Sequence, residues 1–430
     1  MILKHRDVEL LTFDWVDGHG VRIVSVNDQV RHLLPLEFRD NLTDEALWRW
    51  LNHRVIPANR NNAERLLRSV GLAPGDTCGI IEISRGLSLN DVYWVVPLDS
   101  AAKWQDNNLY DNPFSKALQF AAFTGAGITS PDKWTTSPEF TTNGMLAKCW
   151  HRAKGEILLY KSGTEGGANS GNEPYSEFLA SQLAEALGID HVSYDLATYK
   201  GRLCSTCPLF TSDKVGFVPI GRLKDRDSAI SDARFSWMFL FDALIFNTDR
   251  HLGNFGYLID NDTNEIIGAA PLFDNGYGLF SRAIYKNKYV DDFNDLSEYA
   301  KGLKPALYDD WLSFPGGLDD AMKAGLDRLV GFRFKRHRYY NLPSGRVSAI
   351  ESFLQERISE ILGLCGNMYS SSTLDRLRIA IKTNPLVTQN ELAKLLGVSR
   401  VTVAYYIGKL RDKGEIVRIG SDRTGRWELR

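Results

Sequence analysis

Three polar residues are spaced as a phosphoryl-transfer enzyme needs them. Asp249 and Asn254 lie five positions apart in the segment NTDRHLGNFG, and Asp274 follows in LFDNG. The same spacing separates the base from the metal-binding asparagine in a protein-kinase catalytic loop. Asp249 would accept or orient a substrate hydroxyl, while Asn254 and Asp274 offer the hard oxygen ligands that Mg²⁺ prefers. These residues predict a kinase that uses ATP and Mg²⁺.

A kinase also needs groups upstream that hold the triphosphate. Lys161 ends a predicted strand and would sit over the α- and β-phosphates, and Glu177 on the following helix would pair with it, with Glu173 as the second choice. Each motif alone is common in proteins, but their joint occurrence in the order found in kinases favours a functional site over chance. The predicted nucleotide contacts are Thr141, Thr142, Asn143 and Gly144 in a phosphate loop, Phe210 and Thr211 after a strand, and His251.

The pattern of elements fits this order. Residues 138–212 predict a β–β–α–β–β sequence, as in a kinase N-lobe, including a strand–turn–strand over 140–150. A helix over 232–246 leads into the Asp249 loop, and a second helix spans 350–364. We expect an N-lobe over 131–212 and a C-lobe over 213–367.

Residues 1–130 predict an α/β region without a catalytic constellation. Strands are expected over 10–26, 79–84 and 92–97, and helices from Thr43 and over 62–70. Two arginines here, Arg54 and Arg60, could bind an anion, although solvated charge is the simpler interpretation.

The tail, residues 373–430, predicts a winged helix-turn-helix. Two helices and a glycine turn precede a third, amphipathic helix and a basic two-stranded wing. Twelve Lys and Arg stand against six Asp and Glu in this segment, a balance that suits a phosphate backbone. A module for protein contacts is the alternative to double-stranded DNA binding. The predicted DNA contacts are Ser399, Arg400, Thr402, Tyr405, Arg423 and Arg426.

The Asp-Arg-His order resembles phosphatidylinositol kinases and, more closely, HipA-like bacterial serine/threonine kinases. The HipA-type Asp-x-His-x-x-Asn loop is matched by Asp249, His251 and Asn254, and its later metal aspartate by Asp274. The resemblance covers about residues 138–365 and implies an α+β, two-lobed kinase-like fold, a protein substrate and an antitoxin-like regulator. It also implies that Thr141 and Thr142 are the candidates for regulatory autophosphorylation, although Thr-Thr-Asn-Gly departs from HipA's serine–alanine–glycine run.

The length, net charge and cysteine content of the chain limit the remaining classes of function. The chain has 430 residues, a formal net charge of -2 and five scattered cysteines, so several domains and no disulfide framework are expected. We see no membrane span and no signal-peptide core, and we expect a cytoplasmic bacterial protein. The alternatives are a transcription regulator whose kinase fold senses nucleotide, and a small-molecule or lipid kinase. The basic cluster over 333–338 leaves a lipid substrate open.

Overall fold

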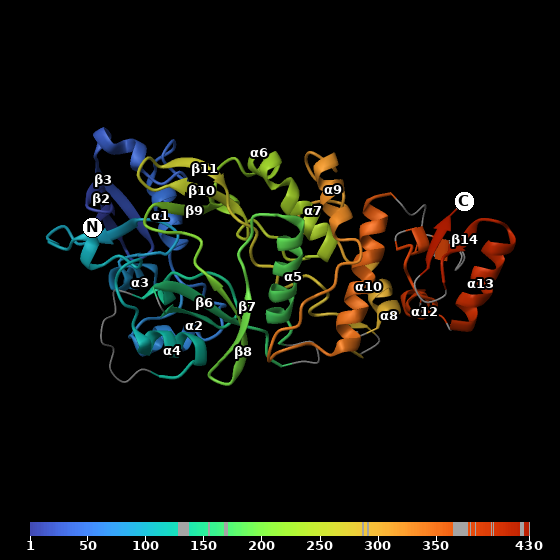
Figure 1. The fold of residues 1–430 in the computed structure, drawn as a ribbon. Helices are drawn as coiled ribbons and strands as arrows, with labels where there is room; N and C mark the ends of the chain where they lie inside the picture. The colour runs from blue at the N-terminus through green and yellow to red at the C-terminus, as the bar shows by residue number, and fades with distance from the viewer. Residues whose placement is uncertain are drawn as a thin grey trace.

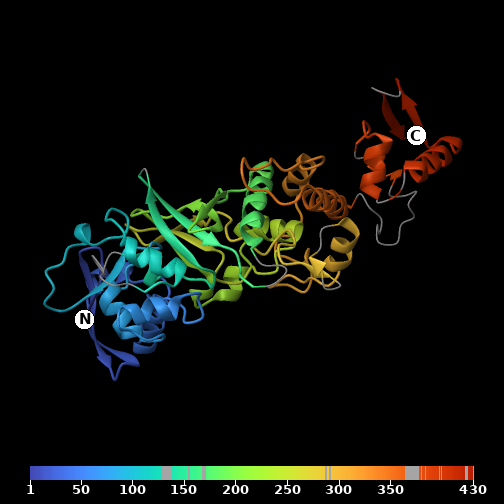
Figure 2. The same cartoon turned by 90° about the horizontal axis from the view of Figure 1, so that it is seen from below.

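The computed structural model describes most of the chain. The described residues are 1–127, 137–153, 155–166, 171–285, 288–289, 292–363, 377–378, 380–382, 384–396, 398, 400–421 and 425–429. Among them, no helix has both the length and the apolar character needed to cross a membrane. Figures 1 and 2 show the elements of residues 1–127 at one end of the molecule, beside the strands that follow them in sequence.

The N-terminal region is built on an antiparallel sheet in the order β3-β2-β1-β4. The aromatic and aliphatic side chains on one face of this sheet pack against α1, which begins where the Thr43 hydroxyl accepts a hydrogen bond from the Ala46 amide. The elements are β1 (Ile2–His5), β2 (Val8–Val16), β3 (Gly20–Val26), η1 (Asp28–Leu33), α1 (Asp44–Asn52), α2 (Ala63–Ser69), α3 (Thr77–Ser84), β4 (Tyr93–Val96), η2 (Trp104–Asp106) and α4 (Lys116–Thr124).

Helix α3 corrects the strand predicted over 79–84. Its isoleucines favour a strand by propensity, but the Asp76 carboxylate accepts a hydrogen bond from the Gly79 amide and so caps a helix. Ile80 and Ile81 then enter two neighbouring clusters of buried side chains. Tertiary burial on both sides of the helix therefore outweighs local propensity.

The predicted β–β–α–β–β order of the next region is confirmed, with antiparallel strands in the order β5-β6-β8-β7. The strand–turn–strand predicted over 140–150 is wrong in its first half, because η3 (Pro138–Phe140) and a loop precede the strand. The other elements are β5 (Lys148–Ala153), β6 (Glu156–Ser162), α5 (Glu173–Leu187), β7 (Asp195–Tyr199) and β8 (Arg202–Pro208). Strand β5 lies at an edge of its sheet. Helix α5 lies between β7 and the helices of the following region, as Figure 1 shows.

The following region is mainly helical around a small sheet in the order β11-β10-β9. Helix α7 is buried along nearly its whole length and forms the centre of the largest hydrophobic cluster. The predicted helix over 232–246 is shorter than expected, because the 3₁₀ turn η5 precedes it and Phe246, with a φ of 55°, ends it. The elements are β9 (Val215–Pro219), η4 (Ile220–Arg222), α6 (Arg226–Ile230), η5 (Ala233–Phe235), α7 (Ser236–Ile245), β10 (Gly256–Asp260), β11 (Glu265–Ala269), β12 (Ile284–Tyr285), β13 (Lys288–Tyr289), α8 (Phe293–Ala300), α9 (Asp320–Arg328) and α10 (Ser344–Ile361).

The described part of the tail contains α12 (Gln389–Leu396), α13 (Arg400–Asp412), β14 (Ile416–Ile419) and β15 (Arg426–Leu429). Before α12, the Thr388 hydroxyl accepts from the Glu391 amide while the Glu391 carboxylate accepts from the Thr388 amide. This reciprocal capping box fixes the start of the helix. Strands β14 and β15 pair as an antiparallel hairpin, which is the predicted wing.

Candidate functional site

Lys161, Glu177 and Asp274 meet in one ionic cluster, although three separate segments carry them. The Lys161 ammonium lies 2.9 Å from a Glu177 carboxylate oxygen and 2.5 Å from an Asp274 carboxylate oxygen. The second Glu177 oxygen accepts a hydrogen bond from the Asn275 amide at 2.8 Å. Glu177 therefore fixes both the strand lysine and the loop that carries Asp274.

Arg250 joins the two loops that the sequence singled out. Its guanidinium donates to both Asp242 carboxylate oxygens at 2.9 Å and to the Asn254 carbonyl oxygen at 2.9 Å. It also donates to the Phe273 carbonyl oxygen at 2.7 Å and to the Asn275 side chain at 2.7 Å. The arginine side chain is almost fully buried, so these bonds are shielded from water.

The Asp249 loop is fixed mainly by its own backbone. The Asn254 side-chain amide donates to the Asp249 carbonyl oxygen at 3.2 Å, and the His251 amide donates to the same oxygen at 2.7 Å. His251 itself is exposed, and its Nδ1 accepts from the Gly253 amide at 3.0 Å. Immediately after this loop stands Gly256, where a Cβ atom would collide with the Val218 carbonyl oxygen of the neighbouring strand.

The charges in this cluster influence one another strongly. Burial would raise the pKa of the Asp274 carboxyl, but the ammonium groups of Lys161 and Lys148 outweigh it and hold that pKa below its usual range. Burial lowers the Lys161 pKa, yet the Asp274 and Glu177 carboxylates raise it by more, so this lysine stays charged. Burial raises the pKa of Asp249, and the nearby Asp274 charge adds to that rise against the opposing effect of His251.

Lys148 is a second lysine at the site that the sequence did not single out. It pairs directly with Lys161 across β5 and β6, is buried, and donates to the Asn143 carbonyl oxygen at 2.8 Å. Burial and the neighbouring Lys161 charge lower its pKa to about 7. The available signal was a lysine inside the otherwise apolar run LAKCW.

The predicted phosphate loop is only partly as expected. The Thr141 hydroxyl donates to the Leu87 carbonyl oxygen, and the Thr142 hydroxyl donates to the Pro138 carbonyl oxygen, both at 2.7 Å. Both hydroxyls are thus engaged within the protein, because the turn of η3 directs them back onto the chain. Asn143 and Gly144 are exposed, and Gly144 has a φ of 90° with no room for a Cβ beside Lys148.

Phe210 and Thr211 lie beyond β8, in the segment that connects it to β9. Phe210 packs against Phe217 and Phe273, with ring centroids 5.4 and 5.3 Å apart. The Thr211 hydroxyl donates to the Leu89 carbonyl oxygen of the N-terminal region at 2.5 Å. The side chains of both residues therefore support the connecting segment, and its backbone remains the group that a base could meet.

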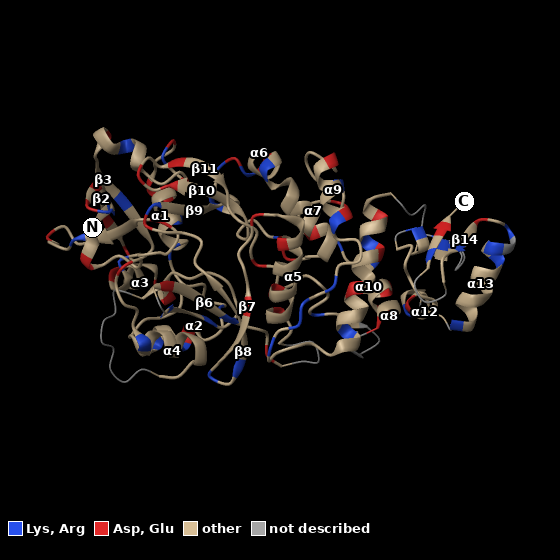
Figure 3. Cartoon of the chain, viewed as in Figure 1, with Lys and Arg blue, Asp and Glu red and all other residues tan. Residues whose placement is uncertain are grey.

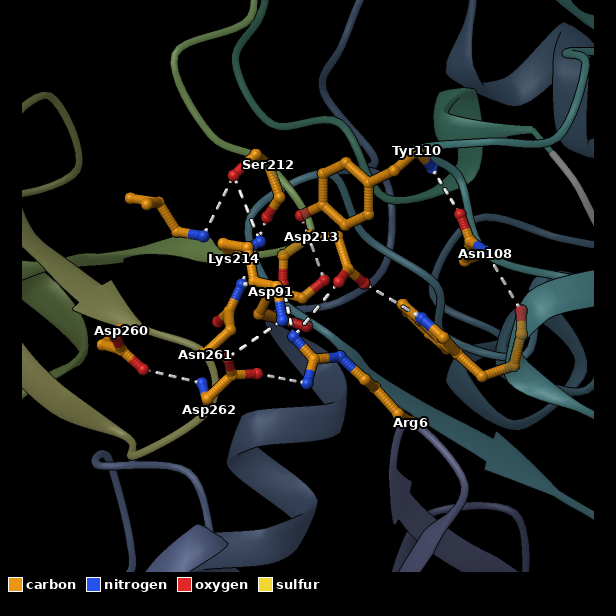
Figure 4. A network of polar contacts seen from close by, with 12 residues as sticks. Arg6, Asp91, Asn108, Tyr110, Ser212, Asp213, Lys214, Asp260, Asn261 and Asp262 are labelled. Atoms are coloured by element: carbon orange, nitrogen blue, oxygen red, sulfur yellow. Dashed lines mark hydrogen bonds and ion pairs between the residues drawn. The ribbon is translucent and has the colours of Figure 1, made fainter.

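Polar side chains join the N-terminal region to this connecting segment, as Figure 4 shows. The Arg6 guanidinium donates to the Asp213 carbonyl oxygen at 2.6 Å and forms an ion pair with Asp262 at 2.5 Å. The Trp104 indole donates to the Asp213 carboxylate at 3.1 Å, and the Asn261 side chain donates to the carbonyl oxygens of Ser212 and Asp213. The connecting segment is thus bound from the N-terminal side and from the β10–β11 turn.

The predicted metal residues Asp274 and Asn254 carry oxygen donors, which suit a hard cation better than a soft one. Asp274 supplies a carboxylate and Asn254 an amide oxygen, which are ligand types that fit Mg²⁺ and leave positions for phosphate oxygens and water. The described residues contain no cluster of three or more His, Cys, Asp or Glu side chains poised to hold a metal on their own. Cys204 and Cys207 are buried free thiols on β8.

Four of the six predicted DNA contacts lie in the described part of the tail. Arg400 and Tyr405 lie exposed on α13, with Thr402 half-buried between them, and Arg426 is exposed on β15. Lys409 lies 4.9 Å from the Tyr405 ring centroid, and Figure 3 shows basic residues along α13. Ser399 and Arg423 fall outside the described residues.

The described elements form a mixed α/β fold with a winged-helix domain at its C-terminal end. Residues 379–426 match the model of the MarR family, which confirms the predicted winged helix. The chain is 28% identical over 154 residues to the serine/threonine-protein kinase CtkA of Helicobacter pylori, covering 29% of this chain and 47% of that protein. It thus spans about half the length of this curated relative, and the match agrees with the kinase resemblance predicted from the sequence.

Two solved structures are also similar. The H. pylori proinflammatory kinase CtkA matches with a TM-score of 0.40 and 20% identity, covering 50% of this chain and 92% of that one. The HipA, HipB and operator DNA complex of Shewanella oneidensis MR-1 matches with a TM-score of 0.46 and 13% identity, covering 96% and 99%.

Proposed function

We propose that this protein is an ATP- and Mg²⁺-dependent serine/threonine-protein kinase with a DNA-binding tail. The observation that carries the proposal is the Lys161 ammonium held between Glu177 and Asp274, at 2.9 and 2.5 Å. A kinase needs a lysine that a helix glutamate orients toward the phosphates, beside an aspartate that holds the metal. Similarity to a serine/threonine kinase supports the same function.

Each residue then has a defined role. Lys161 would hold the α- and β-phosphates of ATP, and Asp274 and Asn254 would hold Mg²⁺ through their side-chain oxygens. Lys148, which pairs with Lys161 across β5 and β6, would add a second amino group beside the phosphates. Bound there, the metal would neutralise the charge that develops on the transferred phosphoryl group.

Asp249 is the group that orients the attacking hydroxyl. Its carbonyl oxygen accepts hydrogen bonds from Asn254 and His251, which restrict the backbone at this residue. The raised pKa caused by burial suits a group that accepts a proton during transfer. The exposed Asn143 and Gly144 would cover the phosphates through backbone amides, and the connecting segment after Phe210 would meet the adenine.

The tail would bind double-stranded DNA through α13 and the wing. The match to the MarR family and the exposed Arg400, Tyr405 and Arg426 support this proposal. Binding through cationic side chains would be strongly salt-dependent. Coupling of the kinase site to transcription, and an antitoxin-like partner, stay predictions.

The kinase proposal is tested by phosphoryl transfer from labelled ATP and Mg²⁺ to the proteins of a bacterial extract, with labelled species identified by mass spectrometry. Asp249→Asn and Asp274→Asn should each abolish transfer while leaving the fold intact. Asp260→Asn is the matched control, because its carboxylate accepts hydrogen bonds from the backbone of its own turn. Undiminished transfer in either site variant would contradict the assignment.

A further inference from the structure

Arg60 connects the N-terminal region to the segment that precedes β5. Its guanidinium donates to the Lys148 carbonyl oxygen at 2.7 Å, the Thr142 carbonyl oxygen at 3.1 Å and the Glu139 carbonyl oxygen at 3.3 Å. It also forms an ion pair with the Glu139 carboxylate at 3.3 Å, and both side chains are at most 1% exposed. The expectation of solvated charge is therefore wrong for Arg60, and it is also wrong for Arg54, whose side chain is buried and paired with Asp91.

Glu139 extends the same set of contacts into the strand. Its other carboxylate oxygen accepts from the Trp150 amide at 2.9 Å, and the Trp150 indole donates to the Thr142 hydroxyl at 2.9 Å. Both ends of the segment over 139–150 are thus tied to one buried ion pair. The Asn61 amide, next to Arg60, adds a bond to the Met145 carbonyl oxygen at 2.8 Å.

This segment carries Gly144 and Lys148, and Lys148 pairs with Lys161 across β5 and β6. The Lys148 ammonium bonds back to the Asn143 carbonyl oxygen at 2.8 Å, so its position depends on the path of the loop. Since Arg60 binds carbonyl oxygens before and after Gly144, it restricts that path at both ends. A guanidinium suits this task because its rigid fork of donors can serve several acceptors at once.

We propose that Arg60, together with Glu139, is a positioning residue of the nucleotide site, which gives residues 1–127 a role in ATP binding. The inference rests on the proposed kinase function. The N-terminal region also contacts the segment that follows β8. Arg6 donates to the Asp213 carbonyl oxygen (Figure 4), and the Leu89 carbonyl oxygen accepts from the Thr211 hydroxyl. The N-terminal region therefore holds both the loop over the phosphates and the segment expected at the adenine.

The test replaces the ion pair as a unit, because removing one partner would leave a buried charge and unfold the region. The variant is Arg60→Met with Glu139→Gln, and Arg60→Lys provides a milder change that keeps the charge. The matched control is Arg54→Met with Asp91→Asn. Arg54 and Asp91 form a pair in the same region at 2.7 and 2.9 Å, with the arginine buried and the aspartate 14% exposed, and Arg54 binds the carbonyl oxygens of Gly86 and Tyr93 instead.

We expect the Arg60/Glu139 variant to raise KM for ATP about 10-fold while kcat at saturating ATP stays within about 3-fold, since the catalytic loop is untouched. Arg60→Lys should fall between this variant and the wild type. Hydrogen exchange in peptides covering 139–150 should become faster. The Arg54/Asp91 control should lower the melting temperature but leave KM for ATP and this exchange unchanged.

The outcomes separate the two proposals. An unchanged KM in the folded Arg60/Glu139 variant, or an equal rise in the Arg54/Asp91 control, would overturn the positioning role. If the double variant fails to fold, Arg60→Lys decides, and wild-type KM and exchange in that variant would overturn the role. Failure of the wild-type chain to bind ATP would overturn the kinase proposal and the nucleotide part of this inference, whereas the exchange measurement would still report on the loop.

Discussion

Replacing Glu177 by glutamine should weaken catalysis without unfolding the protein. The side chain is fully buried, with one oxygen 2.9 Å from the Lys161 ammonium and the other 2.8 Å from the Asn275 amide. Glutamine preserves the shape and one acceptor but removes the charge. A hydrogen bond to a charged partner contributes about 1.5–3 kcal/mol. At about 1.4 kcal/mol for each factor of ten, kcat/KM for ATP should fall about 10- to 150-fold.

The Glu177→Gln change should also alter the requirement for Mg²⁺, because Lys161 contacts both Glu177 and Asp274. Without the Glu177 charge, Lys161 would bind Asp274 more tightly, at 2.5 Å already, and would compete with Mg²⁺ for that carboxylate. The concentration of Mg²⁺ needed for half-maximal rate should therefore rise along with KM for ATP.

The assay is steady-state phosphoryl transfer with ATP and Mg²⁺ varied independently, with circular dichroism as the check of folding. Glu185→Gln is the matched control, because Glu185 lies exposed on the same helix. Wild-type kcat/KM in folded Glu177→Gln, or an equal loss in Glu185→Gln, would refute the reasoning.

Three further predictions concern stability and the tail. Leu244→Ala, at a fully buried position of α7, should destabilise the fold by about 2–5 kcal/mol in urea unfolding. Burial and the nearby Arg222 lower the pKa of His53 to about 4. The stability that neutral His53 gives the fold is therefore full above pH 6.5 and is lost as pH falls toward 4. Between pH 7 and 5 we expect the free energy of unfolding to fall by about 1 kcal/mol, a figure discounted for the partial exposure of His53. The variant His53→Gln should abolish this fall. Deleting residues 370–430 should remove salt-sensitive DNA binding but spare ATP binding, and retained DNA binding would contradict the assignment.

Spacing and order along the chain were enough to predict the main cluster. Lys161, Glu177 and Asp274 occur in the order that a kinase requires, and the structure brings them within hydrogen-bonding distance. That agreement arises because strand alternation and helix periodicity determine which face each residue occupies. The roles of Asp249 and Asn254 remain predictions for the assays above.

Contacts between distant segments could not be predicted in this way. Arg60 and Glu139 are 79 positions apart, and a single sequence holds no signal that joins them. The hydroxyls of Thr141 and Thr142 appeared free because the turn that engages them was not recognised. Helix α3 was missed because propensity is a weak guide where burial on two sides decides the conformation.

The contacts on β5 also bear on assembly of the chain. As an edge strand, β5 has outward backbone groups that could pair with a strand of another molecule. Arg60 donates a hydrogen bond to the Lys148 carbonyl oxygen, and Gln119 donates one to the Trp150 carbonyl oxygen. The Glu139 carboxylate accepts one from the Trp150 amide. A fragment that lacks residues 1–127 would lose the contacts from Arg60 and Gln119 and keep only the one from Glu139, and we expect this fragment to aggregate more readily than the full chain.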